Sequence, residues 1–372
     1  MLQGLELFSE TSGLWPNESK SAVYCCGMKE QEVQRALNAS GFCKSDMLFR
    51  YLGIPICSKR ISSKECEILL EKMVQRIRVW SSRNISFAGR ATLVNLVLLS
   101  IHVYWSQIVL LPKFVLKRVI AICRAFLWKG DYSSHAPGYV SWAKVCLPKN
   151  EGGLGFRQIQ LWNIAAIGKY IWVVASKKDN LWVKWVHNVY IGEMDWWEYS
   201  APNSSSWYWK QVVKIKEKFK AKVDVAEFIS TEYSINKRYK SLISTHPKVS
   251  WQLEVWSRMS VPKHHFLLWL AVLQRVQTRE RLFKIQVWTD VTCLVCGKHD
   301  ETLYHLFFDY FLSRYCLEEI KRWLNWNTKA ISVSQLMKSI VRQRQNCFRK
   351  QVYGGSLAAM VYLIWQNRNE IY

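Results

Sequence analysis

The chain has 372 residues, half of them hydrophobic, and its mean hydropathy of −0.09 is typical of a folded globular protein and excludes general disorder. Fifty-two Lys and Arg residues stand against 28 Asp and Glu residues, which gives a formal net charge of +24. Such an excess favours binding to polyanions, of which nucleic acids are the commonest, although a basic surface that serves only solubility is the alternative.

Two stretches hold much of the excess charge. Between Lys72 and Gly130 there are ten basic residues and no acidic residue, and between Ile320 and Asn369 there are nine basic residues and no carboxylate. Both stretches are predicted to form surfaces that bind nucleic acid.

The cysteines and the N-terminal sequence indicate an intracellular protein. Eleven cysteines show no regular framework, and residues 1–17 contain Glu6 and Glu10 and lack the apolar stretch of a signal peptide. Free thiols in a reducing compartment are therefore expected. The most apolar stretch, Leu93 to Leu111, is interrupted by polar residues, which predicts a buried helix and no membrane partner.

Three helices are predicted in the first half of the chain, after a segment to about residue 60 that alternates turn signals with short apolar runs. The first runs from Lys64 to about residue 80, with apolar residues on one face. The second follows Ser86 and ends near residue 107, before Pro112 stops it. The third runs from Lys113 to Trp128.

This third predicted helix has an apolar face and a basic face. The basic face carries Lys113, Lys117 and Arg124, with Trp128 beside them. Cations next to an aromatic ring suit a phosphate backbone with one stacked base. The alternative is a solvated face with Trp128 in the core, and the twenty tryptophans of the chain are interpreted mainly as core residues.

The second half of the chain is also predicted to be helical. Helices are expected at about 158–176 and 181–190, and a lysine-dense helix follows the loop at 203–206. A tail helix would place Leu336, Ile340 and Cys347 on one face. Its opposite face is predicted to bind nucleic acid through Lys338, Arg342 and Arg349.

The sharpest local signal is a cluster of cysteine and histidine residues. Cys293 and Cys296 are spaced as in a zinc knuckle, and His305 follows nine residues later. Two thiolates and an imidazole supply three of the four ligands of tetrahedral zinc. Tyr310 stands at the natural place for the fourth ligand but is a poor one. The nearby substitutes are His299, Asp309 and Cys316, and the alternative is a pair of reduced cysteines that hold no metal.

Carboxylates do not form the cluster that polymerase or nuclease chemistry needs to hold two Mg²⁺ ions. The chain has eight aspartates, no two of them adjacent, and the adjacent Glu318 and Glu319 would point about 100° apart on a helix. The sequence therefore predicts no magnesium site, no catalytic residue and no enzymatic activity.

Short blocks along the whole chain occur in the order of a known family. They comprise residues 7–21, 50–55, 86–93, 104–105, 111–112, 126–130, 152–156, 206–210, 255–256, 262–270, 279–282, 301–302, 305–308, 364–365 and 368–369, together with the cysteine knuckle. On these blocks the chain resembles the C-terminal half of plant LINE-type (non-LTR) retrotransposon reverse transcriptases, including their zinc-binding domain.

The resemblance implies that the chain descends from a polymerase and that the protein is located in the nucleus. The family's catalytic aspartates are expected upstream of the first residue here, so no polymerase site is expected in this chain. In the family's pattern, Cys-x2-Cys…His-x4-Cys, the last cysteine is replaced by Tyr310. A weakened zinc site is therefore expected.

Together these observations predict a mainly α-helical protein of several helical subdomains. They comprise a truncated palm remnant (1–60), a thumb-like helical region (61–150), a helical connector (151–229), a zinc-binding-like domain (230–326) and a basic helical tail (327–372). The expected function is non-specific binding of RNA or DNA by a non-catalytic retroelement fragment. The alternatives are a reverse transcriptase part that is active only with a separate palm domain, and a domesticated protein-interaction module.

Overall fold

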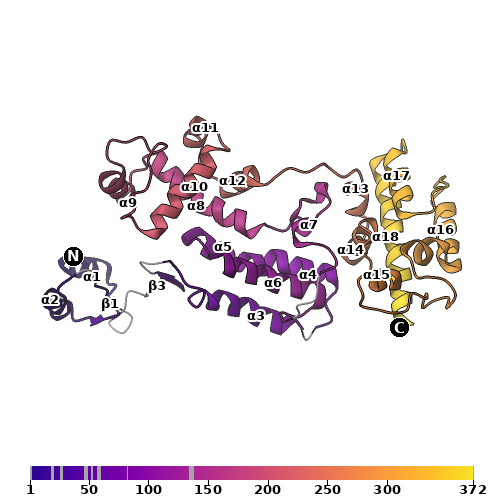
Figure 1. Cartoon of the computed structure of the whole chain (residues 1–372), viewed down its shortest axis with the longest axis horizontal. Coiled ribbons are helices and arrows are strands. Elements are labelled where there is room, and N and C mark those ends of the chain that lie inside the picture. The colour runs from indigo at the N-terminus through magenta and orange to yellow at the C-terminus, as the bar shows by residue number, and fades with distance from the viewer. Residues whose placement is uncertain are drawn as a thin grey trace. The chain divides into compact units, whose positions relative to one another are not determined.

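The computed structural model describes residues 2–17, 21–25, 28–45, 49–51, 53–56, 60–81, 83–133 and 138–371 (Figure 1). Helices make up most of this part of the chain, as the sequence predicted, and its strands are short. The chain divides into two compact units. Unit 1 comprises Met1–Ile68, Trp105–Val115 and Ile164–Arg238, and unit 2 comprises Leu69–Tyr104, Leu116–Asn163 and Tyr239–Tyr372. The bounds of the five predicted domains stay predictions.

Unit 1 begins with short strands and two helices. Helix α1 (Leu2–Ser12) comes first. Strand β1 (Ala22–Val23) then pairs in parallel with β2 (Cys43–Lys44), and helix α2 (Glu30–Ser40) connects the two strands. Strands β3 (Phe49–Tyr51) and β4 (Ile54–Ile56) form an antiparallel hairpin whose turn includes Gly53 at φ +82°. A positive φ is tolerated there because glycine has no Cβ.

The rest of unit 1 is helical and aromatic in its core. It is built from α9 (Leu181–Val186), the π-helical turn η4 (His187–Ile191), α10 (Trp207–Lys220), α11 (Val225–Ser230) and most of α8 (Ile159–Ala175). On α10, the buried indole of Trp209 donates a hydrogen bond to Tyr199 Oη over 3.1 Å. The fully buried Lys216 donates from Nζ to the carbonyl oxygens of Trp196, Trp197 and Tyr199. The lysine-dense helix therefore also serves the core.

The first helices of unit 2 begin close to the predicted residues. They are α3 (Glu67–Ser81), α4 (Phe87–Leu93), the π-helical turn η2 (Val94–Leu98), α5 (Leu99–Ile108) and α6 (Lys113–Lys129), and α3, α5 and α6 each have a few residues in unit 1. The side chain of Ser86 caps α4 by accepting a hydrogen bond from the Gly89 N–H over 3.3 Å. Such capping satisfies a backbone donor that has no partner within the helix.

The continuous helical stretch Phe87–Ile108 is buried along one face only, so the prediction of a buried helix is wrong for its other face. The buried side includes Val94, Leu98, His102 and Trp105, whereas Leu96 is 66% exposed. By length and composition this stretch is apolar enough to cross a membrane, with 22% of its most apolar window buried. Of the polar residues that interrupt it, Ser100 and Gln107 are exposed, whereas His102 and Ser106 are buried.

The C-terminal part of unit 2 is a cluster of helices around α18 (Cys347–Glu370), which packs against α13 (Gln252–Val255), α14 (Pro262–Val272), α16 (Phe311–Trp323) and α17 (Val333–Arg342) (Figure 1). The smaller elements of unit 2 are α7 (Trp142–Cys146), the 3-10 turn η3 (Lys149–Glu151), α15 (Arg279–Lys284) and the π-helical turn η5 (His305–Asp309), and α12 (Ile235–Leu242) is divided between the two units. A Cβ at Gly354 would lie 2.5 Å from the Glu254 carbonyl oxygen, so glycine permits α13 and α18 to approach closely.

The predicted single tail helix is wrong. Helix α17 ends at Arg342, and a new helix begins when the Asn346 side chain accepts a hydrogen bond from the Arg349 N–H over 2.8 Å. Cys347 is exposed and does not continue the buried face of Leu336 and Ile340. The second helix lies in the core of unit 2 instead of forming a solvated tail.

Candidate metal centre

The Cys293–His299 loop folds into a tight knuckle. The Cys293 N–H donates to the His299 carbonyl oxygen over 2.7 Å, and the Gly297 N–H donates to the Cys293 carbonyl oxygen over 2.9 Å. Gly297 adopts φ +65°, and Thr292 pairs with Asp300 in an antiparallel bridge that closes the loop. These bonds bring the two thiols to the same side.

His305 completes a group of three donor atoms. It is the first residue of η5, and its Nε2 lies 3.3 Å from Cys296 Sγ. The ligand atoms of Cys293, Cys296 and His305 all lie within 4.8 Å of one another. Cys293 and His305 are buried, and Cys296 is half-buried. Two sulfurs and an imidazole nitrogen at this spacing fit zinc.

The knuckle favours a thiolate at Cys296. Burial opposes ionisation, but hydrogen bonds from the Lys298 N–H and from His299 outweigh it and lower the pKa of the Cys296 thiol to about 6. Burial raises the pKa of Cys293 instead. Since the thiolate is the form that binds metal, Cys296 is prepared for coordination near neutral pH.

The three substitutes for the missing cysteine lie outside this group. His299 is exposed, with Nδ1 3.9 Å from Cys296 Sγ, and Cys316 lies on α16. Asp309 Oδ2 lies 3.2 Å from His305 Nδ1. Asp309 therefore orients the imidazole, as carboxylates commonly do behind metal-bound histidines, and leaves Nε2 facing the thiols. Tyr310 follows η5 and donates its N–H to the His305 carbonyl oxygen over 2.8 Å.

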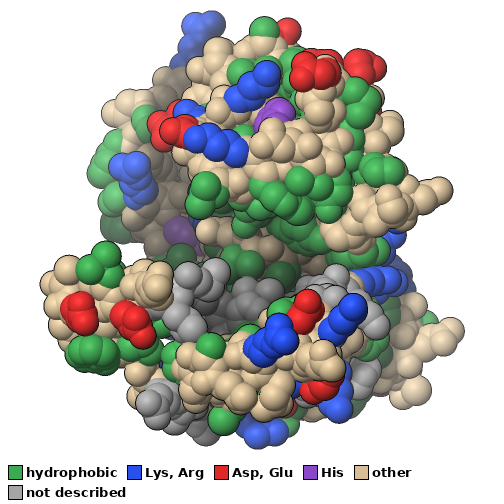
Figure 2. Space-filling view, turned by 90° about the vertical axis from the view of Figure 1, so that its left-hand side faces the viewer, with side chains coloured by type: hydrophobic (Ala, Val, Ile, Leu, Met, Phe, Trp, Pro, Cys, Tyr) green, Lys and Arg blue, Asp and Glu red, His purple; other side chains and the backbone are tan. Residues whose placement is uncertain are grey.

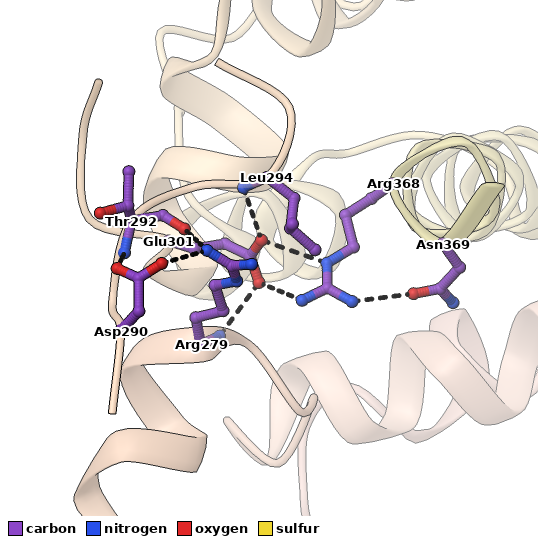
Figure 3. Close-up of polar contacts among 7 residues, drawn as sticks. All are labelled: Arg279, Asp290, Thr292, Leu294, Glu301, Arg368 and Asn369. Atoms are coloured by element: carbon purple, nitrogen blue, oxygen red, sulfur yellow. Dashed lines mark hydrogen bonds and ion pairs between the residues drawn. The ribbon is translucent and has the colours of Figure 1, made fainter. Parts of the chain in front are cut away.

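A buried carboxylate fastens the knuckle to α18 (Figure 3). Glu301 is 0% exposed and accepts hydrogen bonds from Arg368 Nε over 3.1 Å and from Arg368 Nη2 over 2.8 Å. It also accepts from the backbone N–H of Arg279 over 3.0 Å and of Leu294, inside the knuckle, over 3.4 Å. Every acceptor site of the buried charge is thereby used, which is the condition for burying it.

A second ion pair closes the same loop from outside. Arg279 Nη1 donates to Asp290 Oδ2 over 2.6 Å and to the Thr292 carbonyl oxygen over 2.8 Å (Figure 3). No role was predicted for Glu301, Arg279 or Arg368, although all three lie in the blocks that carry the resemblance. Their pairing could not be found because 67 residues separate the two partners of the buried bridge.

The predicted basic surfaces are partly accessible. On α6, Lys113 and Lys117 are exposed and Arg124 is half-buried. Lys338 and Arg342 are exposed on α17, and so is Arg349 in the first turn of α18. On the face drawn in Figure 2, Lys and Arg side chains lie singly or in small groups among hydrophobic and acidic ones. Positive charge is thus dispersed on this face.

The proposed stacking role of Trp128 is wrong. Its side chain is 2% exposed, and its ring lies 4.9 Å from Tyr139 and 6.0 Å from Phe266, measured between centroids. A buried ring offers no face to a nucleic-acid base. The alternative interpretation, a core tryptophan, agrees with these contacts.

Comparison with known proteins supports the expected resemblance. Residues 233–315, which include the knuckle, match the family described as zinc-binding in reverse transcriptase. A protein of Arabidopsis thaliana named as a ribonuclease H protein is 37% identical over 142 residues, which are 38% of this chain and 23% of that protein. A mitochondrial protein of the same plant is 23% identical over 120 residues, which are 32% of this chain and 78% of that protein. The chain thus spans about a quarter of the first relative.

Proposed function

We propose that this retroelement-derived chain binds RNA or DNA without sequence preference and has no catalytic site of its own. The observation that carries the proposal is the group of three zinc-ligand atoms within 4.8 Å, inside the region that matches the reverse transcriptase zinc-binding family. We further propose that the source is a LINE-type element and that the protein acts inside the cell, in the nucleus.

Charge supports the nucleic-acid part of the proposal. The net charge is +24, and exposed lysines and arginines occur on α6, α17 and the start of α18. Lysine and arginine bind phosphate by releasing condensed counterions, a process that does not depend on base sequence. Contacts to phosphate carry no base information, so this charge favours weak, salt-sensitive binding over recognition of one site.

Zinc would act as a structural cross-link in this function. Cys293, Cys296 and His305 would hold the ion, and the free energy of binding would also stabilise the folded knuckle. Asp309 fixes the orientation of His305, and Glu301 connects the knuckle to α18. The ion would therefore stabilise the helices around α18 without taking part in a reaction.

The non-catalytic part of the proposal rests on the sequence. Phosphoryl transfer with two metal ions requires clustered carboxylates, and no two of the eight aspartates are adjacent. Purified protein is expected to show neither template-dependent nucleotide incorporation nor nuclease activity with Mg²⁺ or Mn²⁺. Incorporation that survives stringent purification would overturn this part.

Binding is tested by fluorescence anisotropy with labelled RNA and DNA of several unrelated sequences. We expect similar affinities for all sequences and a loss of affinity between about 50 and 200 mM salt. Absence of binding at low salt, or a strong preference for one sequence that persists in high salt, would contradict the proposal. The first of these results would favour a protein-interaction module.

A further inference from the structure

Unit 2 contains a cleft of about 540 Å³ whose walls come from distant parts of the chain. The start of α4, the start of α14 and the C-terminal part of α18 line it. Three half-buried aromatic side chains and two cationic side chains face this space: Phe87, Tyr362, Trp365, Arg90 and Lys263. The amides of Asn84, Gln366 and Asn369 and the carboxylate of Glu370 also line it.

Arg90 is held in the cleft by packing. Its guanidinium carbon lies 5.2 Å from the centroid of the Phe87 ring. A Cβ at Gly130, where φ is +80°, would lie only 3.0 Å from the same carbon, so glycine makes room for the arginine. Burial lowers the pKa of Arg90, which nonetheless stays a cation. In the part of the chain that the structure describes, its guanidinium has no hydrogen bond and no carboxylate partner.

Lys263 offers a second cation without a carboxylate partner among the described residues. Its Nζ lies 4.7 Å from the centroid of the Tyr362 ring, and the imidazole of His264 lies 4.6 Å from that ring. Burial and the neighbouring Lys263 lower the pKa of His264. Glu370, the acidic group of the lining, accepts a hydrogen bond from Gln366 over 2.9 Å.

We propose that this cleft binds one or two nucleotides of a single-stranded nucleic acid, an inference that rests on the proposed function. Arg90 and Lys263 hold the phosphates, and an unstacked base lies against Trp365 or Tyr362. Proteins commonly bind single strands with cations that contact the phosphates and aromatic rings that contact the bases. Such a surface accepts any sequence, because every base has a face that stacks. The volume is that of a small-ligand pocket, and the rings can meet only bases that are not already paired and stacked.

The metal centre supports one wall of this cleft. The guanidinium carbon of Arg368 lies 5.0 Å from the centroid of the Trp365 ring, and Arg368 Nη1 donates to Asn369 Oδ1 over 3.1 Å. Glu301 holds Arg368 in turn and accepts from the Leu294 N–H in the knuckle (Figure 3). The zinc-binding region therefore positions Trp365 and Asn369, which gives it a role in binding without contacting the strand.

The test compares the full chain with the double variant Arg90→Gln/Lys263→Gln. The matched control is Lys214→Gln/Lys218→Gln, which removes two charges from exposed residues of α10. The probes are labelled single strands of RNA and DNA about 12 nucleotides long, and a duplex of the same sequence. We expect the cleft variant to bind the single strands about tenfold more weakly and to lower the salt slope by about 1.4, while duplex binding changes as in the control.

A second measurement reports on stacking. Single strands carrying 4-thiouridine are cross-linked to the unmodified protein with light, and the modified peptides are identified by mass spectrometry. We expect cross-links on Tyr362 or Trp365. The single variant Lys263→Gln, an exposed position, guards against a folding defect of the double variant and is expected to give part of the same loss.

Two results would overturn the proposal in different ways. If the unmodified protein binds no nucleic acid, both the cleft and the proposed function fail. If it binds but the cleft variant loses no more affinity than the control, or the cross-links fall elsewhere, the function stands and the cleft fails.

Discussion

The carboxylate of Glu301 and the guanidinium of Arg368 form a buried, two-point ion pair between the zinc knuckle and the last helix of the chain, with the nearest atoms 2.8 Å apart. Both side chains are at least 92% buried, the carboxylate completely. The pair joins the knuckle, which lies in the region that matches the zinc-binding family, to α18, which lines the cleft, and it adds to the packing of α13 and α14 on that helix.

Removing one partner of this pair should destabilise the protein strongly. For Glu301→Gln we expect a loss of about 3–5 kcal/mol in the free energy of unfolding, because Arg368 would remain buried without a counter-charge. The measurement is urea denaturation at neutral pH. The exposed pair of Arg322 and Glu319 supplies the control, since Glu319→Gln should cost at most about 1 kcal/mol.

The double variant Glu301→Leu/Arg368→Met separates charge from packing. It should recover part of the stability that Glu301→Gln loses, because no charge is left buried and unpaired. A double variant less stable than Glu301→Gln would show that the pair stabilises the fold by more than mutual neutralisation.

Zinc retention should depend on residue 310. Three protein ligands leave the fourth position to water, an arrangement more usual for catalytic zinc than for a structural site. We expect Tyr310→Cys to retain zinc against a competing chelator better than the unmodified protein does. Zinc content after dialysis is the measurement. His299→Ala and Asp309→Asn are the comparisons that detect a substitute ligand.

The weakened-site interpretation has a clear contrary outcome. If the unmodified protein keeps one tightly bound zinc ion and Tyr310→Cys adds nothing, a substitute ligand is already in place. A simultaneous loss in His299→Ala would then identify that ligand, because its Nδ1 lies 3.9 Å from Cys296 Sγ.

The basic face of α6 should contribute to the salt dependence of nucleic-acid binding. Replacing Lys113, Lys117 and Arg124 together by Ala is expected to weaken binding and to reduce the salt slope by up to about 3, one for each phosphate contact. Arg124 is half-buried and should contribute least. An unchanged slope would mean that this face is only solvated. Lys338, Arg342 and Arg349 would then be the next candidates for the phosphate contacts.

His102 should make the stability depend on pH below neutrality. It is 0% exposed, and burial together with the charge of Arg157 lowers its pKa from 6.5 to about 4. The unfolded chain therefore binds more protons between these values, so stability is complete above pH 6.5 and decreases as the pH falls toward 4. The decrease amounts to about 3 kcal/mol.

The variant His102→Leu should lose this part of the pH dependence, as measured by urea denaturation from pH 7 to pH 4. The exposed His246 supplies the control, and His246→Gln should keep the dependence of the unmodified protein. A slope that persists in His102→Leu would assign the effect to other groups, with His264 and His265 the next candidates because burial lowers the pKa of both.

Local signals allowed much of the secondary structure to be predicted from the sequence. Caps and stops act within a few residues: Ser86 begins α4 and Ser206 begins α10 through single hydrogen bonds to nearby N–H groups, and Pro112 separates α5 from α6. The spacing of Cys293 and Cys296 likewise fixes a short loop, because the backbone hydrogen bonds that close it join residues at most ten positions apart.

Tertiary structure alone decided which of these elements are buried and what they surround. Helical periodicity places Trp128 beside the basic face of its helix. Its side chain is nevertheless buried, because Phe87, Tyr139 and Phe266 enclose it. Helix α18 belongs to the core because Gly354 permits it to approach α13 closely and because Arg368 forms an ion pair with Glu301. Burial and ion pairing depend on which distant segments meet, a property that helical periodicity cannot supply, since it reports only that one face is apolar.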